Sequence, residues 1–268
     1  MEVIEIFGFV GALLIGVTLG LIGGGGSILT VPVLVYLFHF SPVTATAYSL
    51  FVVGSSSLVG AIQNVKKKLV DFKTTALFAL PAFMTVYITR KYIVPIIPED
   101  ILSIGNFVLN KDVAIMLLFA FIMIFSSYSM IKGKCEHCEE AKDVLVSYNI
   151  PMILLEGIVI GFITGIVGAG GGFLIIPALV VLAKLSMKRA VATSLLIIAI
   201  KSLIGFLGDV QNLQIDWSFL LVFTSFSIVG MFIGVYLGNF VKGKKLKKFF
   251  GWFVLVMGIY ILINEFRR

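Results

Sequence analysis

One lysine is the residue of this sequence whose surroundings most favour a chemical role. Lys201 lies inside the apolar stretch 190–208, and an ammonium at membrane depth costs about 2.5–3.5 kcal/mol on insertion scales. A cation kept at that cost is by default a functional hypothesis, here a side chain that holds an anion. Two structural alternatives stay open: an ion pair with an acid such as Glu156 or Asp209, or partial extension of the side chain toward an interface.

Two glycine runs, residues 23–26 and 168–172, are suited to bind the same anion. Each run separates a long apolar segment from a short one, and consecutive glycines break helices. Broken backbone in a membrane is tolerated only where it is buried in protein or lines an aqueous cavity. A helix that begins at a break offers unpaired N–H groups and its positive dipole end, and Ser27 is placed to cap the first such helix. Two of these ends that meet would form an anion site, with close helix packing as the alternative.

Serine and threonine hydroxyls add neutral donors to this predicted site. Ser49 and Ser194 occupy equivalent positions in two similar stretches, and Ser202 lies two helical turns beyond Ser194 on the same face. A hydroxyl in an apolar helix can instead bond the carbonyl four residues earlier, so each has a structural alternative. The predicted substrate-binding set is Gly25, Gly26, Ser27, Ser49, Gly170, Gly171, Gly172, Thr193, Ser194, Lys201 and Ser202.

The composition requires that lipid surround the elements that position these residues. Of 268 residues, 59% are apolar and 13% are charged, with a mean hydropathy of +1.10, whereas soluble domains carry about twice that charged share. A single globule of this size could not bury so much apolar surface. A soluble enzyme, a disordered chain, a secreted disulfide scaffold and a nucleic-acid binder are therefore excluded, and the formal charge of +7 is read as topological information.

Ten apolar segments follow one another along the chain. Two of them, 27–39 and 172–183, are too short to cross the hydrocarbon, because a spanning helix needs roughly 20 residues. Both short segments follow a glycine run, which predicts broken or re-entrant helices there. The ten segments are 3–22, 27–39, 43–62, 74–89, 113–131, 150–167, 172–183, 190–208, 217–241 and 249–263.

An internal repeat relates the two halves of the sequence. Residues 16–72 align without a gap to residues 161–217, at an offset of 145, with 20 identities in 57 positions that include both prolines, the paired serines and both aspartates. The predicted division is a first transmembrane repeat at 1–131, a cytoplasmic linker at 132–149 and a second transmembrane repeat at 150–268. Because each half has five segments, an odd number, the two repeats should be inverted relative to each other. The fold class predicted is an all-α polytopic membrane protein.

The distribution of lysine and arginine predicts the orientation. With the N-terminus outside and the segments alternating, fifteen of the 21 basic residues lie in cytoplasmic connections and Lys201 lies within a segment. This bias predicts a multi-pass membrane protein whose N-terminus lies outside. The five outer cations are Arg90, Lys91, Lys111, Arg267 and Arg268.

Two further polar features have structural interpretations. Asp71 and Asp216 stand at equivalent starts of apolar segments and are expected to cap helices. Cys135, His137 and Cys138 lie in the polar linker, where a plain loop is favoured because zinc needs four ligands.

Several motifs resemble those of the sulfite exporter TauE/SafE family of membrane permeases. They are Gly-Gly-Gly-Gly-Ser27-Ile-Leu-Thr-Val-Pro32, its counterpart Gly168-Ala-Gly-Gly-Gly-Phe-Leu-Ile-Ile-Pro177, Lys188-Arg-Ala-Val-Ala-Thr-Ser194, and the Val-Asp71 and Ile-Asp216 pairs before an aromatic residue. The resemblance implies an inner-membrane carrier of sulfur-containing anions such as sulfite or organosulfonates. The sequence departs from the family pattern at Tyr48, and at Lys201 where asparagine is expected. The motif residues carried over by position are Gly23, Gly25, Gly26, Pro32, Ser49, Gly168, Gly170, Gly171, Gly172, Pro177 and Ser194.

Residues and resemblance together predict a secondary transporter that moves sulfite or an organosulfonate by alternating access. An anion channel of the same architecture and a carrier of a non-sulfur anion are the alternatives. An intramembrane enzyme is not expected, because the apolar segments contain no nucleophile with a base and no metal-ligand set. The expected partners are the small anion and the lipid bilayer, without nucleic acid. No cofactor is expected, and the coupling ion stays open between a proton and sodium.

Overall fold

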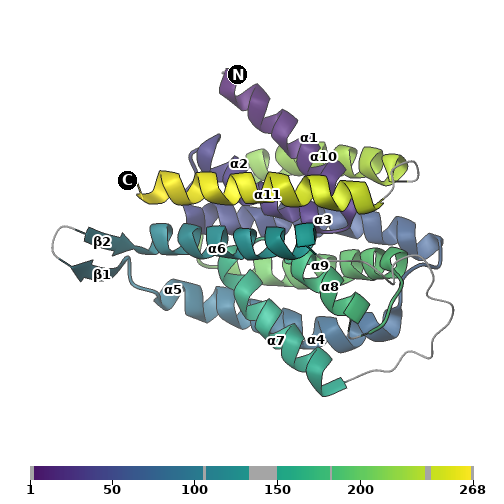
Figure 1. Ribbon diagram of the computed structural model, residues 1–268. Coiled ribbons are helices and arrows are strands. Elements are labelled where there is room, and N and C mark those ends of the chain that lie inside the picture. The colour runs from purple at the N-terminus through teal and green to yellow at the C-terminus, as the bar shows by residue number, and fades with distance from the viewer. Residues whose placement is uncertain (1–2, 105–106, 133–149, 182, 239–242, 267–268) are drawn as a thin grey trace.

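The computed structural model describes residues 3–104, 107–132, 150–181, 183–238 and 243–266 as a helical protein with one small hairpin (Figure 1). The element η1 is a 3-10 helix and η2 is a π-helix that continues α4. The elements are α1 Val3–Ile22, η1 Gly25–Leu29, α2 Thr30–Tyr36, α3 Pro42–Lys66, α4 Phe72–Ile88, η2 Thr89–Ile93, α5 Val94–Ile96, β1 Asp100–Ile104, β2 Phe107–Asn110, α6 Lys111–Lys132, α7 Ile150–Val167, α8 Gly172–Val181, α9 Met187–Asp209, α10 Trp217–Leu237 and α11 Gly243–Phe266.

Five helices in the described residues are long and apolar enough to cross a membrane. Many of their outward side chains are large and apolar, and Phe125 and Tyr236 are both more than half exposed. A surface of this kind needs lipid as its solvent, so the chain is an integral membrane protein. The five candidate spans are Pro42–Lys66, Phe72–Ile96, Lys111–Tyr128, Met187–Asp209 and Trp217–Leu237.

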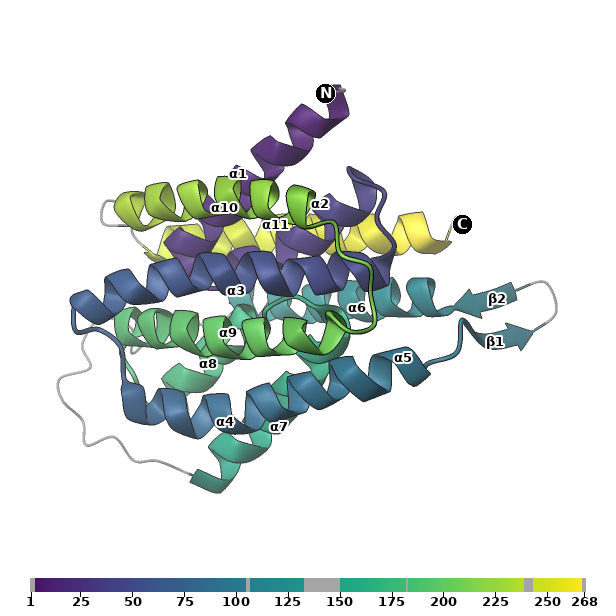
Figure 2. The same ribbon diagram turned by 180° about the vertical axis from the view of Figure 1, so that it is seen from behind.

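Helices α3 and α9 lie side by side in the middle of the molecule, between α10 and α4 (Figure 2). They run antiparallel, because Gly54 of α3 lies against Leu203 of α9 whereas Gly60, further along α3, lies against the earlier Leu195. Helix α1 packs on α10, α7 packs on α4, and α6 packs on α11. The outer helices of each half thus pack largely on helices of the other half.

Contacts at equivalent positions recur in the two halves. A methyl group on Gly16 would lie 1.8 Å from the Ser227 carbonyl oxygen, and one on Gly161 would lie 2.6 Å from the Ala82 carbonyl oxygen. Both the glycines and their partners are separated by the offset of 145. The glycines therefore let the backbones of α1 and α7 approach α10 and α4 closely, as is typical of small residues at helix interfaces in membranes.

The two aspartates cap helices as predicted. Asp71 accepts a hydrogen bond from the Thr74 N–H at 2.9 Å at the start of α4, and Asp216 accepts one from the Phe219 N–H at 3.0 Å at the start of α10. The Asp216 N–H also donates to the Tyr48 hydroxyl at 2.7 Å. Each carboxylate satisfies an N–H that the helix itself leaves unpaired.

We expect Asp216→Ala to lower the free energy of unfolding by about 1 kcal/mol, because the first turn of α10 loses its cap. Thermal or denaturant unfolding of the detergent-solubilised protein measures this loss. Asp216→Asn is the matched control, since an amide oxygen also caps a helix. Equal losses in the two variants would contradict the capping role.

The hairpin is a difference from the all-α expectation. Strands β1 and β2 pair antiparallel between α5 and α6, and the Lys111 N–H donates to the Glu99 carbonyl at 2.8 Å beside them. The two strands are only five and four residues long, too short to stand out among the long apolar helices, so the hydropathy pattern gave no signal for them. The hairpin marks one end of the molecule, where α4 and α9 both finish (Figure 2).

Candidate functional site

Both glycine runs interrupt helices, as the sequence predicts. Gly24 has a φ of 116° and separates α1 from η1, whereas Gly170 and Gly171 have φ values of 62° and 69° and separate α7 from α8. Residues with a side chain rarely adopt this left-handed backbone conformation, so glycine is required at these turns. Each break therefore depends on backbone conformations that glycine allows. The first break is followed by η1 and α2, and the second is followed by α8.

The two breaks lie in direct backbone contact. A methyl group on Gly172 would lie 2.4 Å from Gly24 Cα, and one on Gly170 would lie 3.1 Å from Ser27 Cβ. Gly24 and Gly172 are far apart in the sequence, and nothing larger than hydrogen fits between their Cα atoms. The prediction that both breaks meet inside the protein is consistent with this geometry.

Lys201 projects from α9 toward the second break. The side chain is fully buried, and its Nζ donates a hydrogen bond to Thr164 Oγ1 of α7 at 2.7 Å. A methyl group on Gly171 would lie 3.1 Å from the same Nζ. Within the described residues no carboxylate lies close enough to form an ion pair with it. The alternative in which Glu156 or Asp209 pairs with Lys201 is therefore wrong for this conformation.

Ser27 and Ser194 contact the first break through carbonyl groups. The Ser27 hydroxyl donates to the Gly24 carbonyl at 2.7 Å, and the Ser194 hydroxyl lies 3.4 Å from the Gly23 carbonyl and donates to Val191 at 2.8 Å. Ser27 lies inside η1 and does not cap it, so the predicted N-cap is wrong. The glycine run itself makes the turn, and the 3-10 helix has already begun at Gly25.

The side chain of Thr193 makes its hydrogen bond with a residue outside the glycine breaks. Its Oγ1 accepts a hydrogen bond from the Asp71 N–H at 3.0 Å, next to the start of α4. The equivalent Tyr48 hydroxyl accepts the Asp216 N–H in the other half. Both side chains thus fasten a loop to a central helix, which is a structural use of a residue predicted to bind substrate.

Several buried hydroxyls in the described part of the chain have no hydrogen-bond partner. They include Ser49 and Ser202, both fully buried, from the predicted set, and also Ser57, the repeat equivalent of Ser202. An unsatisfied buried hydroxyl costs about 1–3 kcal/mol. Such groups are available to a ligand or to water.

Gly26, also in the predicted set, lies in η1 and packs against helix α1. A methyl group on Gly26 would lie 2.4 Å from the Leu19 nitrogen.

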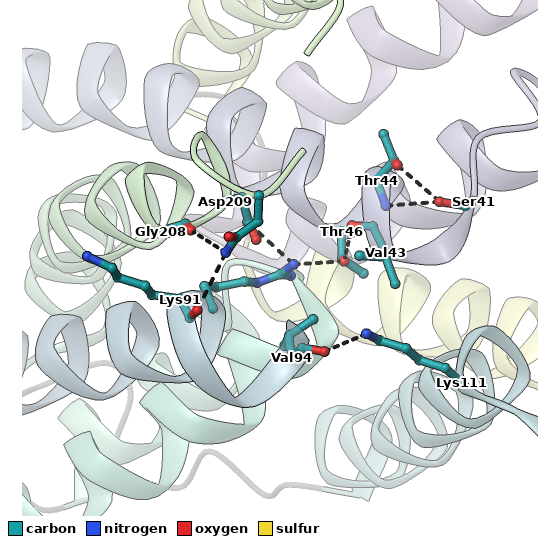
Figure 3. Close-up of polar contacts among 11 residues, drawn as sticks. Ser41, Val43, Thr44, Thr46, Lys91, Val94, Lys111, Gly208 and Asp209 are labelled. Atoms are coloured by element: carbon teal, nitrogen blue, oxygen red, sulfur yellow. Dashed lines mark hydrogen bonds and ion pairs between the residues drawn. The ribbon is translucent and has the colours of Figure 1, made fainter. Parts of the chain in front are cut away.

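A buried ion pair near the hairpin end was not predicted. Arg90, placed by sequence among the outer loop cations, is fully buried, and its Nη1 lies 3.5 Å from Asp209 Oδ2 and donates to Thr46 Oγ1 at 3.1 Å (Figure 3). The apolar count ended at residue 89, but the helix continues through η2 and α5 to Ile96. The missed signal was the apolar run at residues 92–97, which follows Arg90 and Lys91 and continues the helix.

The described residues contain no group of three or more histidine, cysteine or acidic side chains suited to a metal ion. Cys135, His137 and Cys138 fall outside them, as does nearly all of the predicted linker 132–149. The predicted division into two repeats and a linker stays a prediction.

Comparison with known proteins gives a consistent identity. The family model described as sulfite exporter TauE/SafE matches residues 8–261. A probable membrane transporter protein of Xylella fastidiosa (strain 9a5c) is 28% identical over 93% of this chain and 91% of its own length. The probable membrane transporter protein YunE of Bacillus subtilis (strain 168) is 26% identical over 94% of this chain and 92% of its own. The search of solved structures returned no significant match.

Proposed function

The chain belongs to the sulfite exporter TauE/SafE family of membrane transporters, and we propose that it is a secondary transporter of a small oxyanion, sulfite or an organosulfonate. The observation that carries the proposal is the contact between the two glycine breaks with the Lys201 ammonium beside them. Family membership also makes it a transporter rather than an enzyme.

The chemistry of this place suits an anion. At the start of α8, helix geometry leaves the N–H groups of Gly172 and Phe173 without an intrahelical partner, whereas those of Leu174 and Ile175 already bond the Gly171 carbonyl. This end of α8 also carries the positive end of the helix dipole. Lys201 adds a positive charge, and the buried hydroxyls of Ser49 in α3 and Ser202 in α9 lack partners in the described part of the chain. Oxyanions with three oxygens, such as sulfite and sulfonates, match converging donors, and charge-assisted bonds supply the strongest attraction.

We propose that the two repeats are inverted and that transport occurs by alternating access. Support comes from the antiparallel packing of the equivalent helices α3 and α9 and from the matched contacts at Gly16 and Gly161. Inverted repeats around discontinuous helices are common in secondary transporters. In this proposal the N-terminus lies outside a plasma membrane, and either a proton or sodium provides coupling.

An anion channel would use the same architecture, so flux distinguishes the two functions. We expect uptake of labelled sulfite into proteoliposomes to saturate with concentration, because each carrier cycle occupies one site. Flux that rises without saturation would favour the channel.

A screen of ligand-induced stabilisation tests the substrate class. We expect sulfite or a sulfonate such as sulfoacetate to raise the unfolding temperature of the purified protein, whereas taurine, which carries an added ammonium, raises it less. A ligand that binds only the folded state adds about 2.7 kcal/mol at a hundred times its Kd. The control series is sulfate, thiosulfate and carboxylates at equal ionic strength. Stabilisation by carboxylates alone would show a carrier of non-sulfur anions.

A further inference from the structure

The buried Arg90 side chain joins both halves of the protein at the hairpin end. It comes from η2 of the first half and faces Asp209, the last residue of α9 in the second half, while its Nη1 bonds Thr46 of α3. Asn212 adds a bond from its side chain to the Gly208 carbonyl at 3.3 Å and lies 3.5 Å from the Lys91 carbonyl (Figure 3). The guanidinium is thus held at a junction of three helical segments.

Only one nitrogen of this guanidinium is used. Nη1 serves both Thr46 and Asp209, whereas Nε and Nη2 are buried and without a hydrogen-bond partner in the described part of the chain. These two nitrogens form one edge of the guanidinium, and their parallel N–H groups match two oxygens of a carboxylate, sulfonate or phosphate. Buried donors on a charged group are costly to leave empty, so this edge calls for acceptors that the described chain does not provide.

We propose that Arg90 is a second anion-contacting residue of the transport path, whose Nε–Nη2 edge binds two oxygens of the oxyanion. The inference rests on the proposed function, since it assigns a second binding position, the Arg90 station, to the same transported anion. It lies apart from Lys201, which contacts Thr164 and the second glycine break from another helix.

Thr46 connects this station to the glycine breaks. Its hydroxyl accepts the bond from Arg90, and its backbone oxygen would lie 2.4 Å from a methyl group on Gly168, the first residue of the second break. Thr46 therefore contacts both the Arg90 guanidinium and the turn that precedes α8. The two cationic groups can act in sequence on one path.

The repeat shows that the station exists at one end only. At the offset of 145, the equivalents of Arg90, Asp209 and Thr46 are Val235, Asn64 and Val191. None of these can bind an anion by charge. The otherwise matched halves thus differ at the point where an anion enters or leaves at the hairpin end.

Asp209 is expected to compete with the anion. Its Oδ2 lies 3.5 Å from Arg90 Nη1 and makes no hydrogen bond in the described structure, whereas a charge-assisted bond is typically 2.7–2.9 Å. The carboxylate therefore balances the buried charge without occupying the free edge. Its negative charge should weaken anion binding and prevent an uncompensated cation when the station is empty.

The first test replaces Arg90 with lysine in the full-length protein and measures sulfite and sulfoacetate affinity by calorimetry. Arg90→Lys keeps the charge that Asp209 pairs with but removes the two-nitrogen edge. We expect affinity about tenfold weaker or more, since a hydrogen bond to a charged group is worth about 1.5–3 kcal/mol. Lys91→Gln is the matched control, because it removes a charge from the adjacent position, where Nζ bonds the Tyr87 hydroxyl, and it should leave affinity unchanged.

The second test uses Asp209→Asn, for which the anion station and a purely structural ion pair predict opposite results. Removal of the competing carboxylate should strengthen sulfite binding several-fold, whereas loss of a structural pair would only destabilise the protein. Wild-type affinity in Arg90→Lys together with unchanged or weaker binding in Asp209→Asn would overturn the station and leave the transporter proposal standing. Failure of the wild-type protein to bind any oxyanion would overturn both.

Discussion

Replacing Lys201 with methionine should abolish the stabilisation that sulfite gives the protein and, at the same time, raise the stability of the ligand-free protein. The ammonium is fully buried and its one described partner is the neutral Thr164 hydroxyl. Methionine has nearly the same length without the charge, so it removes the desolvation cost, about 2.5–3.5 kcal/mol on insertion scales, while it deletes the cation. Calorimetry with sulfite and thermal unfolding without it measure the two effects.

Thr164→Val is the matched control for the lysine. It removes the hydroxyl that Lys201 bonds but keeps the charge beside Gly171. We expect it to lower the stability of the ligand-free protein and to retain sulfite binding within about threefold, because only a neutral bond is lost. A Lys201→Met protein that binds sulfite with wild-type affinity would show that the ammonium is structural.

The sequence predicted the part of the site that depends on backbone pattern. Glycine runs at a fixed offset identified two breaks, and the structure places Gly24 against Gly172 as that pattern implied. Lys201 was found because a cation in an apolar stretch has few structural explanations. Asp71 and Asp216 were predictable as caps because an acid before an apolar segment has a local function that needs no tertiary contact.

Arg90 was missed, and Thr193 and Ser27 were given roles other than the bonds that the structure shows. Arg90 lies just past the predicted end of its segment at residue 89, and its partners Asp209 and Thr46 come from α9 and α3. Thr193 bonds the Asp71 N–H, 122 residues away in sequence, and no local pattern predicts such a partner. Ser27 follows a glycine run that already turns the chain, so a cap was not needed. Polar residues whose partners lie in the other repeat cannot be assigned from helix periodicity alone.

Replacing Gly172 with alanine should slow transport about tenfold or more while leaving a folded protein. The added methyl group would lie 2.4 Å from Gly24 Cα and 2.6 Å from its carbonyl carbon, and neither backbone atom can rotate away. Overpacking of this kind costs about 1–3 kcal/mol, which corresponds to a rate about 5-fold to 150-fold lower if the conformations of the cycle require this contact. Gly172 is preferred to Gly24 for this test, because Gly24 has a positive φ and alanine there would add backbone strain.

Gly11→Ala in α1 separates this effect from a general response to a methyl group on a helix. The added carbon would meet only the Val33 side chain, at 3.2 Å, and a side chain can yield where backbone cannot. Sulfite uptake into proteoliposomes, normalised to folded protein, should therefore fall about tenfold or more in Gly172→Ala and little in Gly11→Ala. Equal uptake by the two variants would mean that the contact between the breaks can open by a small backbone shift, so that the tight crossing of Gly24 and Gly172 would serve packing rather than the transport cycle.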